Sequence, residues 1–529
     1  MPKPVQASSY TFRHIIEGGF LYVDKTQYLY ELVHRSIGIY FLARPRRFGK
    51  SLMISTLEEI FLGNKELFRD LWIYDSDYDW QKYPILRLDF SRNAVHSAEH
   101  LKQLIDYYVA EIAERNNITL RGFDYQTRFD NLIQQLGRNK RVVILIDEYD
   151  KPLLDNIDHL AEALQIRDTL KHFYTTIKAL DQYIRFVFIT GISKFSKVGI
   201  FSAMNNLADL TMTPRFATAL GITEEELGHY FQEHITEFAH KMGMSEAELA
   251  TELRRWYNGF RFVENCPNVY NPFSTLQLFA NQRFANYWFE TGTPTFLIKL
   301  IKARQYNIEP FEQLEVPELT FSTYELESLE LIPLLFQTGY LTIKDFRRDE
   351  FGELYTLSYP NYEVKHAFLT YLLSAYDEIE VALSEGHLRR LLYALEQQNL
   401  PEFFSVLEVF FASIDYDLHL DYEKYYQTIF YLIFVLLGVR INAGVKTNQG
   451  RIDAVIELAK HIFLFEFKLN GNAAEALQQI KAHAYAQKYQ SKGKPLTLIG
   501  ANFDSTKRKI TEWQSEPDAT VLSTKRISE

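Results

Sequence analysis

The sequence predicts an α/β protein in three parts, and three observations lead to this prediction. Short apolar segments alternate with helical patterns over residues 1–220, as expected for strands buried on both faces of a parallel sheet. Over residues 221–420 the pattern is mostly helical, and over residues 421–529 the alternation of helices and strands returns. We therefore expect an N-terminal α/β domain, a helical middle region and a C-terminal α/β domain.

Composition excludes several classes of protein. Hydrophobic residues make up 47% of the 529 residues and charged residues 24%, which is typical of globular chains and excludes a disordered or collagen-like one. The single cysteine, Cys266, excludes an internal disulfide framework and a cysteine cluster for zinc. The chain starts without the apolar stretch of a secretory signal, and its longest apolar run, Ile429–Val439, is shorter than the about 20 residues that cross a bilayer. We expect a cytoplasmic protein with no membrane partner.

The charge is unevenly distributed along the chain. The net charge is -11, which argues against a general nucleic-acid coat protein, but the segment from Arg440 to the end has 14 basic and 9 acidic residues. A polyanion would therefore meet the C-terminal end of the chain. A chance fluctuation of surface charge is the alternative that the composition leaves open.

The elements of the first domain follow one another as strand and helix. Helices are expected at Leu52–Leu62 and Ser97–Glu114. The strands are expected at four apolar segments, Gly38–Ala43, Pro84–Phe90, Arg141–Asp147 and Ile184–Thr190.

A phosphate-binding loop is expected between the first strand and the helix that follows it. The segment RPRRFGKS, Arg44 to Ser51, ends in the glycine, lysine and serine of a P-loop. Gly49 lets backbone N–H groups face a phosphate, Lys50 reaches the β- and γ-phosphates, and Ser51 offers a hydroxyl to Mg²⁺. Arg44 stands where the usual motif has its first glycine. A basic surface turn that happens to contain these three residues is the alternative interpretation.

Polar residues end two later strands of the same domain. Asp147 and Glu148 end the third strand, a position that P-loop enzymes use for Mg²⁺ and for the base that activates water. Thr190 ends the fourth strand, where a polar side chain can sense the γ-phosphate. Because these groups follow parallel strands, we expect nucleotide binding by a set that shares one edge of the sheet: Gly49, Lys50, Ser51, Asp147 and Thr190.

The middle region contains a helix start and several turn signals. Thr223 and Glu226 form the pattern of a capping box. The segments Tyr257–Phe260 and Tyr270–Phe273 read as turns, and Glu325–Asp345 reads as helix, turn and strand, a winged-helix-like element.

The C-terminal part has a helix, two strands, a helix and a further strand. The expected elements are Tyr422–Leu437, residues 451–458, residues 462–469, Ala473–Tyr489 and Pro495–Phe503.

The two strands at residues 451–458 and 462–469 contain charged residues in apolar surroundings. Glu466 and Lys468 are two apart and therefore share a face of their strand, and Asp453 is expected beside them on the paired strand. Burying such groups is costly without a reason. One reason is a mutual ion pair. The other is metal-assisted phosphodiester hydrolysis, in which Asp453 and Glu466 hold Mg²⁺ and Lys468 stabilises developing charge.

Weaker candidates flank this set. Glu423 is either a further acidic ligand or an ordinary surface residue. The last expected helix offers three residues towards a nucleic-acid backbone, Gln479, Lys481 and Tyr485.

These motifs resemble a bacterial and archaeal family that joins an N-terminal AAA-like ATPase domain to a C-terminal PD-(D/E)xK nuclease-superfamily domain. The resemblance covers most of the chain and rests on YVDKT, ARPRRFGKSL, LIDEYDKPL, FITGISKFS, RRWYNGFRF, YWFETGTPTFL, GRIDAVIE, FLFEFKLNG and LIGANF. The loop without its first glycine is typical of that family. The resemblance implies ATP binding through Lys50, Ser51 and Asp147, with Glu148 as the hydrolytic base. It also implies a restriction-endonuclease-like fold whose catalytic residues are Asp453, Glu466 and Lys468.

The sequence therefore predicts an ATP-binding and ATP-hydrolysing protein coupled to a Mg²⁺-dependent nuclease that acts on nucleic acid, with DNA favoured. The alternative is an ATP-dependent switch that binds DNA or a partner protein without cutting. A translocating motor would require a ring of subunits, and whether the chain forms a homo-oligomer stays open.

Overall fold

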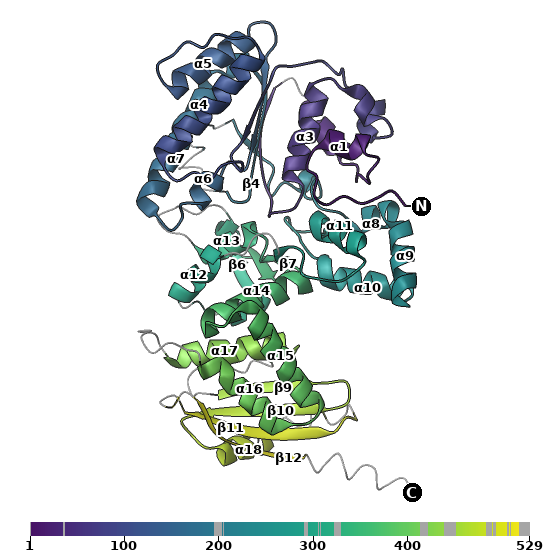
Figure 1. Cartoon of the computed structure of the whole chain (residues 1–529), viewed down its shortest axis with the longest axis vertical. Helices are drawn as coiled ribbons and strands as arrows, with labels where there is room; N and C mark the ends of the chain where they lie inside the picture. The colour runs from purple at the N-terminus through teal and green to yellow at the C-terminus, as the bar shows by residue number, and fades with distance from the viewer. Residues whose placement is uncertain are drawn as a thin grey trace. The chain divides into compact units, whose positions relative to one another are not determined.

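The computed structural model divides the chain into two compact units, and each is described by itself. The first contains residues 1–296 and 310–365, and the second contains residues 297–309 and 366–529 (Figure 1). The expected division at residues 220 and 420 stays a prediction. The structure describes residues 2–34, 37–194, 201, 204, 206–289, 295–304, 306, 308–321, 330–412, 422–438, 451–482, 489, 493–504, 507 and 509–517.

A five-stranded parallel sheet forms the centre of the first unit. Its strands lie in the order β2-β3-β4-β1-β5. Their bounds are β1 Gly38–Ala43, β2 Ile85–Asp89, β3 Val142–Asp147, β4 Ile184–Gly191 and β5 Ala208–Asp209. The first four confirm the strands expected from the apolar segments. The fifth was not predicted, because two residues leave no periodic pattern.

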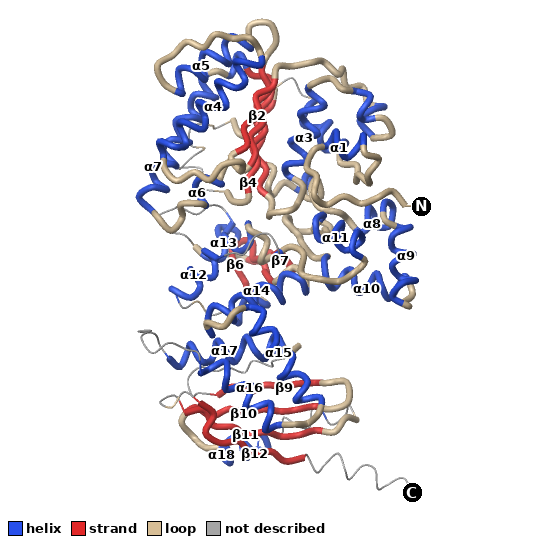
Figure 2. The backbone as a smooth tube through the Cα atoms, viewed as in Figure 1, coloured by secondary structure: helices blue, strands red, loops and turns tan. Residues whose placement is uncertain are grey.

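Helices cover both faces of this sheet, as predicted (Figures 1 and 2). On one face lie α1 (Phe12–Glu17) and α3 (Lys50–Phe61), and on the other lie α4 (Ala98–Arg115), α5 (Tyr125–Leu136) and α7 (Leu160–Ala179). Ser97 caps α4, where its hydroxyl accepts a hydrogen bond from the backbone of His100. Two further helices are α2 (Thr26–Val33) and α6 (Lys151–Leu154), and the 3₁₀ turns are Lys65–Phe68, Trp72–Asp75, Asp181–Tyr183 and Pro214–Phe216.

Four helices with an apolar core of their own follow the sheet. They are α8 (Glu224–Tyr230), α9 (Gln232–Met242), α10 (Glu246–Tyr257) and α11 (Pro272–Asn281). Their core includes Phe231, Phe238 and Leu249. The predicted capping box at the start of α8 is confirmed, since the Thr223 and Glu226 side chains each bond the backbone N–H of the other.

The rest of the middle region contains a small antiparallel sheet. Its order is β6-β8-β7, and the helix α13 (Leu331–Gln337) precedes β7. The strands are β6 (Leu314–Pro317), β7 (Thr342–Asp349) and β8 (Gly352–Ser358), preceded in the chain by α12 (Thr295–Arg304) and two 3₁₀ turns, Glu309–Glu312 and Glu318–Phe321. Helix α13 and strand β7 confirm the expected helix and strand, whereas β6 and β8 were not predicted. The winged-helix-like description stays a prediction.

A four-stranded sheet forms the centre of the second unit. Its order is β12-β11-β10-β9, with β10 and β11 parallel and the outer pairs antiparallel. The strands are β9 (Arg451–Glu457), β10 (Ile462–Leu469), β11 (Leu496–Asp504) and β12 (Lys509–Pro517). The helices are α14 (Tyr362–Asp377), which begins in the first unit, α15 (Val381–Glu396), α16 (Leu400–Ala412), α17 (Tyr422–Leu436) and α18 (Ala473–Ala482). Strand β12 was not predicted.

The two faces of this sheet are covered by different helices. On one face Phe465 and Phe467 of β10 meet aromatic rings of α16 and α17, including Phe434. On the other face Leu464 packs with Leu477 of α18. The alternation along β10 therefore places Glu466 and Lys468 on the α18 side. The sheets of the two units and the helices around them give the mixed α/β fold that the sequence predicts.

The glycine in the turn after α10 has a backbone conformation and a neighbour that exclude a side chain. Gly259 has φ +111°, and a Cβ there would lie 2.1 Å from the carbonyl oxygen of Pro360. We expect Gly259→Ala to lower the midpoint of thermal unfolding clearly, because both backbone strain and a clash with main chain oppose it.

Gly228 is the matched control for this substitution. It lies in α8, and a Cβ there would have no neighbour within 4 Å. Gly228→Ala should be neutral or stabilising by roughly 0.5–1 kcal/mol. Equal melting curves for the two variants would contradict the role given to Gly259.

Candidate functional sites

The loop Arg44–Ser51 joins β1 to α3 and encloses its own lysine. The Lys50 side chain is only 5% exposed, and its Nζ donates to the carbonyl oxygens of Arg44 and Pro45, at 3.0 Å each. Burial lowers the pKa of Lys50, and the nearby Glu148 and Asp147 carboxylates oppose that shift. A lysine held in this way is inconsistent with a basic surface turn.

Position 49 requires glycine because of its backbone conformation, and not because a side chain there would clash with its neighbours. It is the N-cap of α3 with φ +91°, a left-handed conformation, and the nearest atom to an added Cβ is Leu220 Cδ2 at 3.8 Å. The backbone N–H groups that follow open α3, and Ser51 lies in its first turn. This is the geometry by which helix N-termini bind anions.

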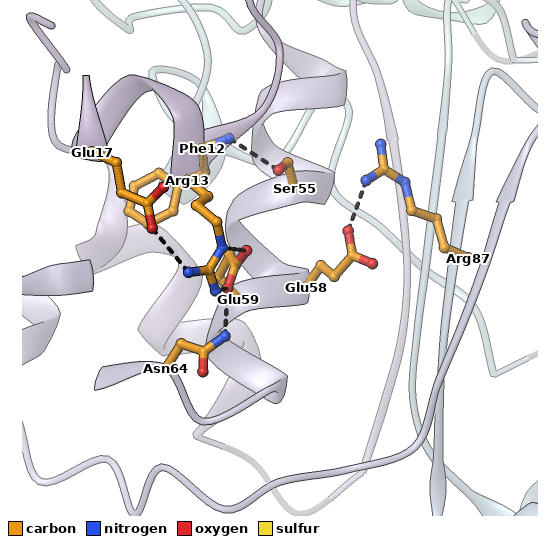
Figure 3. Close-up of polar contacts among 8 residues, drawn as sticks. All are labelled: Phe12, Arg13, Glu17, Ser55, Glu58, Glu59, Asn64 and Arg87. Carbon is orange, nitrogen blue, oxygen red and sulfur yellow. Dashed lines mark hydrogen bonds and ion pairs between the residues drawn. The ribbon is translucent and has the colours of Figure 1, made fainter. Parts of the chain in front are cut away.

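Polar contacts hold α3 on two sides (Figure 3). Arg13 of α1 donates twice to Glu59, at 3.0 and 2.8 Å, and Arg87 of β2 donates to Glu58 at 2.7 Å. The backbone N–H of Phe12 donates to the Ser55 hydroxyl at 3.0 Å. These contacts fix the helix whose N-terminus faces the loop.

Arg44, which replaces the first glycine of the usual motif, is a buried structural residue. Its guanidinium donates to the carbonyl oxygens of Ala43, Thr211 and Phe216 and lies 4.3 Å from the centre of the Phe262 ring. Burial lowers its pKa to about 9. The side chain thus connects the end of β1 to the segment after β5, a role that glycine could not fill.

The acidic edge of the sheet lies where the sequence predicts it. Asp147 ends β3 and is buried, and its Oδ1 accepts a hydrogen bond from the Thr190 hydroxyl at 2.6 Å. Thr190 is the penultimate residue of β4, which lies between β3 and β1. The structure therefore brings Lys50, Asp147 and Thr190 to one edge, as expected for parallel strands.

Glu148 has two unusual features. Its φ is +50°, which is uncommon for a residue other than glycine and marks local strain. Burial raises its pKa, while the charge of Lys50 lowers it. Strain and a displaced pKa at the edge of a sheet are features of functional carboxylates.

Asp150 was not predicted, although it belongs to the same motif LIDEYD. It is fully buried, and its Oδ2 accepts from the backbone N–H groups of Ile192 and Ser193 and from the Ser193 hydroxyl. Burial raises its pKa, and the bonds to Ser193 oppose the shift. Asp150 thus ties the segment after β3 to the segment after β4. The sequence signal that could have identified Asp150 is that it is the third carboxylate of the motif LIDEYD, which follows an apolar strand.

A cavity of about 130 Å³ opens beside the loop, in the first unit. Its walls come from the N-terminal segment, from α3 and from residues 219–222 and 272–276, and Gly49 and Met53 are among them. At its wall Lys25 bonds both Glu226 carboxylate oxygens, at 2.6 and 2.7 Å, and the Thr218 carbonyl. The cavity is largely apolar and adjoins the N-terminus of α3.

The second candidate site lies on β9 and β10. The antiparallel register pairs Asp453 with Glu466, and Lys468 is two residues further along β10. Directly opposed positions lie on one face of a sheet, as the sequence predicts for these three. Glu466 is 1% exposed. The Asp453 side chain lies outside the described residues.

Helix α18 approaches this face closely. Lys468 Nζ donates to Oε1 of Gln479 in α18. Gly500 of β11 is paired with Glu466, and a Cβ there would lie 2.4 Å from the carbonyl oxygen of Ala473, so only glycine lets the helix lie this near. Lys481 forms an ion pair with Glu516. Tyr485 and the side chain of Glu423 lie outside the described residues.

Among the residues that the structure describes, no group of three or more His, Cys, Asp or Glu side chains could hold a metal ion. Among the same residues, no helix is long and apolar enough to cross a membrane.

Comparisons with known proteins establish the family. Residues 7–201 match a family described as "Predicted AAA-ATPase", and residues 421–513 match the PD-(D/E)XK nuclease superfamily. The chain belongs to the family that joins an AAA-ATPase-like N-terminal domain to a C-terminal PD-(D/E)XK nuclease-superfamily domain.

One relative extends over nearly the whole chain. A protein of Azotobacter chroococcum mcd 1, described as "Uncharacterized protein in vnfD 5'region", is 38% identical over 513 residues, covering 94% of this chain and 96% of the relative. A solved structure titled "Structure of Drosophila ORC bound to AT-rich DNA and Cdc6" matches 68% of this chain and 93% of its own, at 8% identity and a TM-score of 0.18. This similarity is too low to support a conclusion about the present chain.

Proposed function

We propose that this protein binds and hydrolyses ATP and that its nucleotide state controls a Mg²⁺-dependent nuclease in the same chain. The observation that carries the proposal is that Lys50, Asp147, Glu148 and Thr190 meet at one sheet edge. We assign the ATPase to residues 1–220, a helical region to 221–420 and the nuclease to 421–529.

Nucleotide binding would use the enclosed lysine. The Lys50 ammonium donates to two carbonyl oxygens of the loop, and phosphate oxygens are stronger acceptors because they are charged. The Ser51 hydroxyl and the Asp147 carboxylate suit Mg²⁺, which prefers hard oxygen ligands. When bound, Mg²⁺ would neutralise charge on the phosphates. The apolar cavity beside Gly49 has the character needed for the flat, largely apolar faces of the adenine base.

Hydrolysis would depend on Glu148 and Thr190. Glu148 takes the proton of the attacking water, and burial raises the pKa of its carboxyl group, which makes it a stronger base than an ordinary glutamate. Thr190 positions the Asp147 carboxylate through its hydroxyl.

The nuclease would use the residues paired across β9 and β10. Asp453 and Glu466 supply the carboxylates that would hold Mg²⁺, which lowers the pKa of a bound water. Lys468 stabilises the charge that develops on the phosphate, and Gln479 positions Lys468 through the contact of its Oε1 with Nζ. The substrate is a nucleic acid, and we favour DNA.

Two substitutions test the ATPase. Lys50→Ala should abolish binding of a fluorescent ATP analogue, because the phosphates lose their cation. Glu148→Gln should keep binding but reduce the kcat for ATP hydrolysis by about 10²–10⁴-fold, because it loses the base. Binding is followed by fluorescence anisotropy and hydrolysis by phosphate release. Equal hydrolysis by wild type and Glu148→Gln would refute the role of Glu148.

The pH dependence of hydrolysis follows from the raised pKa of Glu148. The base acts in its ionised form, so kcat should fall as the pH drops through this pKa, which lies above the ordinary glutamate value of about 4.3. The measurement is kcat against pH, with circular dichroism to confirm folding and ATP-analogue binding as control. A kcat that is flat down to about pH 4.5 in folded protein would contradict the assignment.

The nuclease is tested by Lys468→Ala in an assay of Mg²⁺-dependent cleavage of plasmid, linear duplex, single-stranded DNA and RNA. Cleavage should be lost, with folding unchanged. Lys507→Ala is the matched control, because that lysine is 64% exposed and pairs with Asp504. If wild type binds ATP but cuts no substrate under any condition, the non-cutting switch replaces this proposal.

A further inference from the structure

The outer side of the P-loop is enclosed by the middle region of the chain. The Phe48 ring packs edge-on against the rings of Phe260 and Phe262, with centres 4.9 and 5.3 Å apart. A Cβ added to Gly339, in the turn after α13, would lie 2.7 Å from Pro45. The loop therefore cannot shift without displacing residues that lie more than two hundred positions away in sequence.

Trp288 makes the most direct of these contacts. Its indole Nε1 donates to the carbonyl oxygen of Arg46 at 3.1 Å, and its backbone N–H donates to Oε1 of Glu363 at 2.9 Å. The tryptophan is 7% exposed, and its ring packs against those of Phe260, Phe289 and Tyr340. Trp288 thus donates one hydrogen bond to the P-loop from its side chain and another to Glu363 from its main chain.

Glu363 lies at the start of a helix that leads out of the first unit. It is fully buried in the first turn of α14 and also accepts a hydrogen bond from the Ser274 hydroxyl at 3.1 Å. Helix α14 runs from Tyr362 to Asp377, and the boundary between the two units falls after Lys365. Rigid secondary-structure elements such as helices can carry energetic coupling between distant sites.

The carbonyl groups of the P-loop connect nucleotide binding to this helix. Lys50 Nζ holds the carbonyl oxygens of Arg44 and Pro45, and Trp288 holds that of the next residue, Arg46. An anion in the loop draws the ammonium away from the first two carbonyls. The peptide groups are consecutive, so the release of two of them changes the position of the third.

A second contact joins the middle region to the other side of the site. The backbone N–H of Lys194, three residues after the end of β4, donates to Oε1 of Gln337 at 2.8 Å. Gln337 is the last residue of α13, and Gly339 in the following turn lies against Pro45. The C-terminal end of α13 and the turn after it therefore contact the segment that follows Thr190 and the P-loop, respectively.

We propose that Trp288 is a positioning residue that couples occupancy of the P-loop to α14, and through α14 to the nuclease unit. This inference rests on the proposed function, because it requires that a nucleotide binds the loop. It goes further by naming the connection through which ATP controls cleavage.

The test is hydrogen–deuterium exchange of the full chain with and without a non-hydrolysable ATP analogue and Mg²⁺. The variant is Trp288→Phe, which keeps an aromatic ring and the backbone N–H to Glu363 but removes the indole donor. The matched control is Trp72→Phe, since Trp72 is 46% exposed in the same unit. Affinity for the analogue is measured separately by anisotropy, and the ratio of cleavage rates with and without ATP is measured in parallel.

In wild type and Trp72→Phe, the analogue should change exchange in peptides that cover residues 362–377 as well as in the P-loop. In Trp288→Phe, affinity should stay within about tenfold, because one hydrogen bond is lost. The analogue should still protect the P-loop from exchange, but its effect on exchange in α14 should disappear. The ratio of cleavage rates with and without ATP should fall to about one.

Other results overturn the coupling. A wild type whose P-loop is protected while α14 exchange is unchanged would refute it and leave the ATPase proposal standing. Trp288→Phe with the same change in α14 as wild type would also refute it. A wild type that binds no analogue would refute the proposed function itself, and the coupling with it.

Discussion

The first unit depends on a buried ammonium group. Removing the charge of Lys50 from water is costly, and the fold offsets that cost with loop carbonyls and with the carboxylates of Asp147, Glu148 and Asp150. Those carboxylates come from the end of β3, and only a parallel sheet in which β3, β4 and β1 are neighbours brings that strand end near the P-loop. The strained backbone of Glu148 and the bond from Thr190 to Asp147 lie at the same sheet edge as this ammonium.

Residues distant in the chain also hold the loop. Arg44, in place of glycine, donates to the carbonyl oxygens of Thr211 and Phe216 after β5, so the loop is fixed by side chains as well as by backbone. Phe48, Pro45 and Arg46 then meet Phe260, Gly339 and Trp288. When a nucleotide binds a loop that is packed against other residues, the contacts with those residues can change. A loop exposed to solvent has no such contacts to change.

The structural features that can be predicted from the sequence are those that are local or that repeat along the chain. The apolar runs of four parallel strands give β1 to β4 within one or two residues, and the alternation of Phe465, Glu466, Phe467 and Lys468 gives the two faces of β10. The contacts that it misses join residues distant in the chain. Arg44 bonds a carbonyl 167 residues away, and Trp288 bonds one 242 residues away. Strand β5 is too short to show a pattern, and the short β6 pairs with β8, where Leu314 lies opposite Leu357, which is distant in the chain.

We propose that ATP, bound by the first domain, controls cutting by the last. The most direct measurement is the rate of nucleic-acid cleavage by the full chain in Mg²⁺, titrated with ATP. We expect a rate that changes with ATP, with half of the change reached at the ATP concentration that half-fills the P-loop. Cleavage that is independent of ATP, in protein that binds ATP with measured affinity, would contradict it.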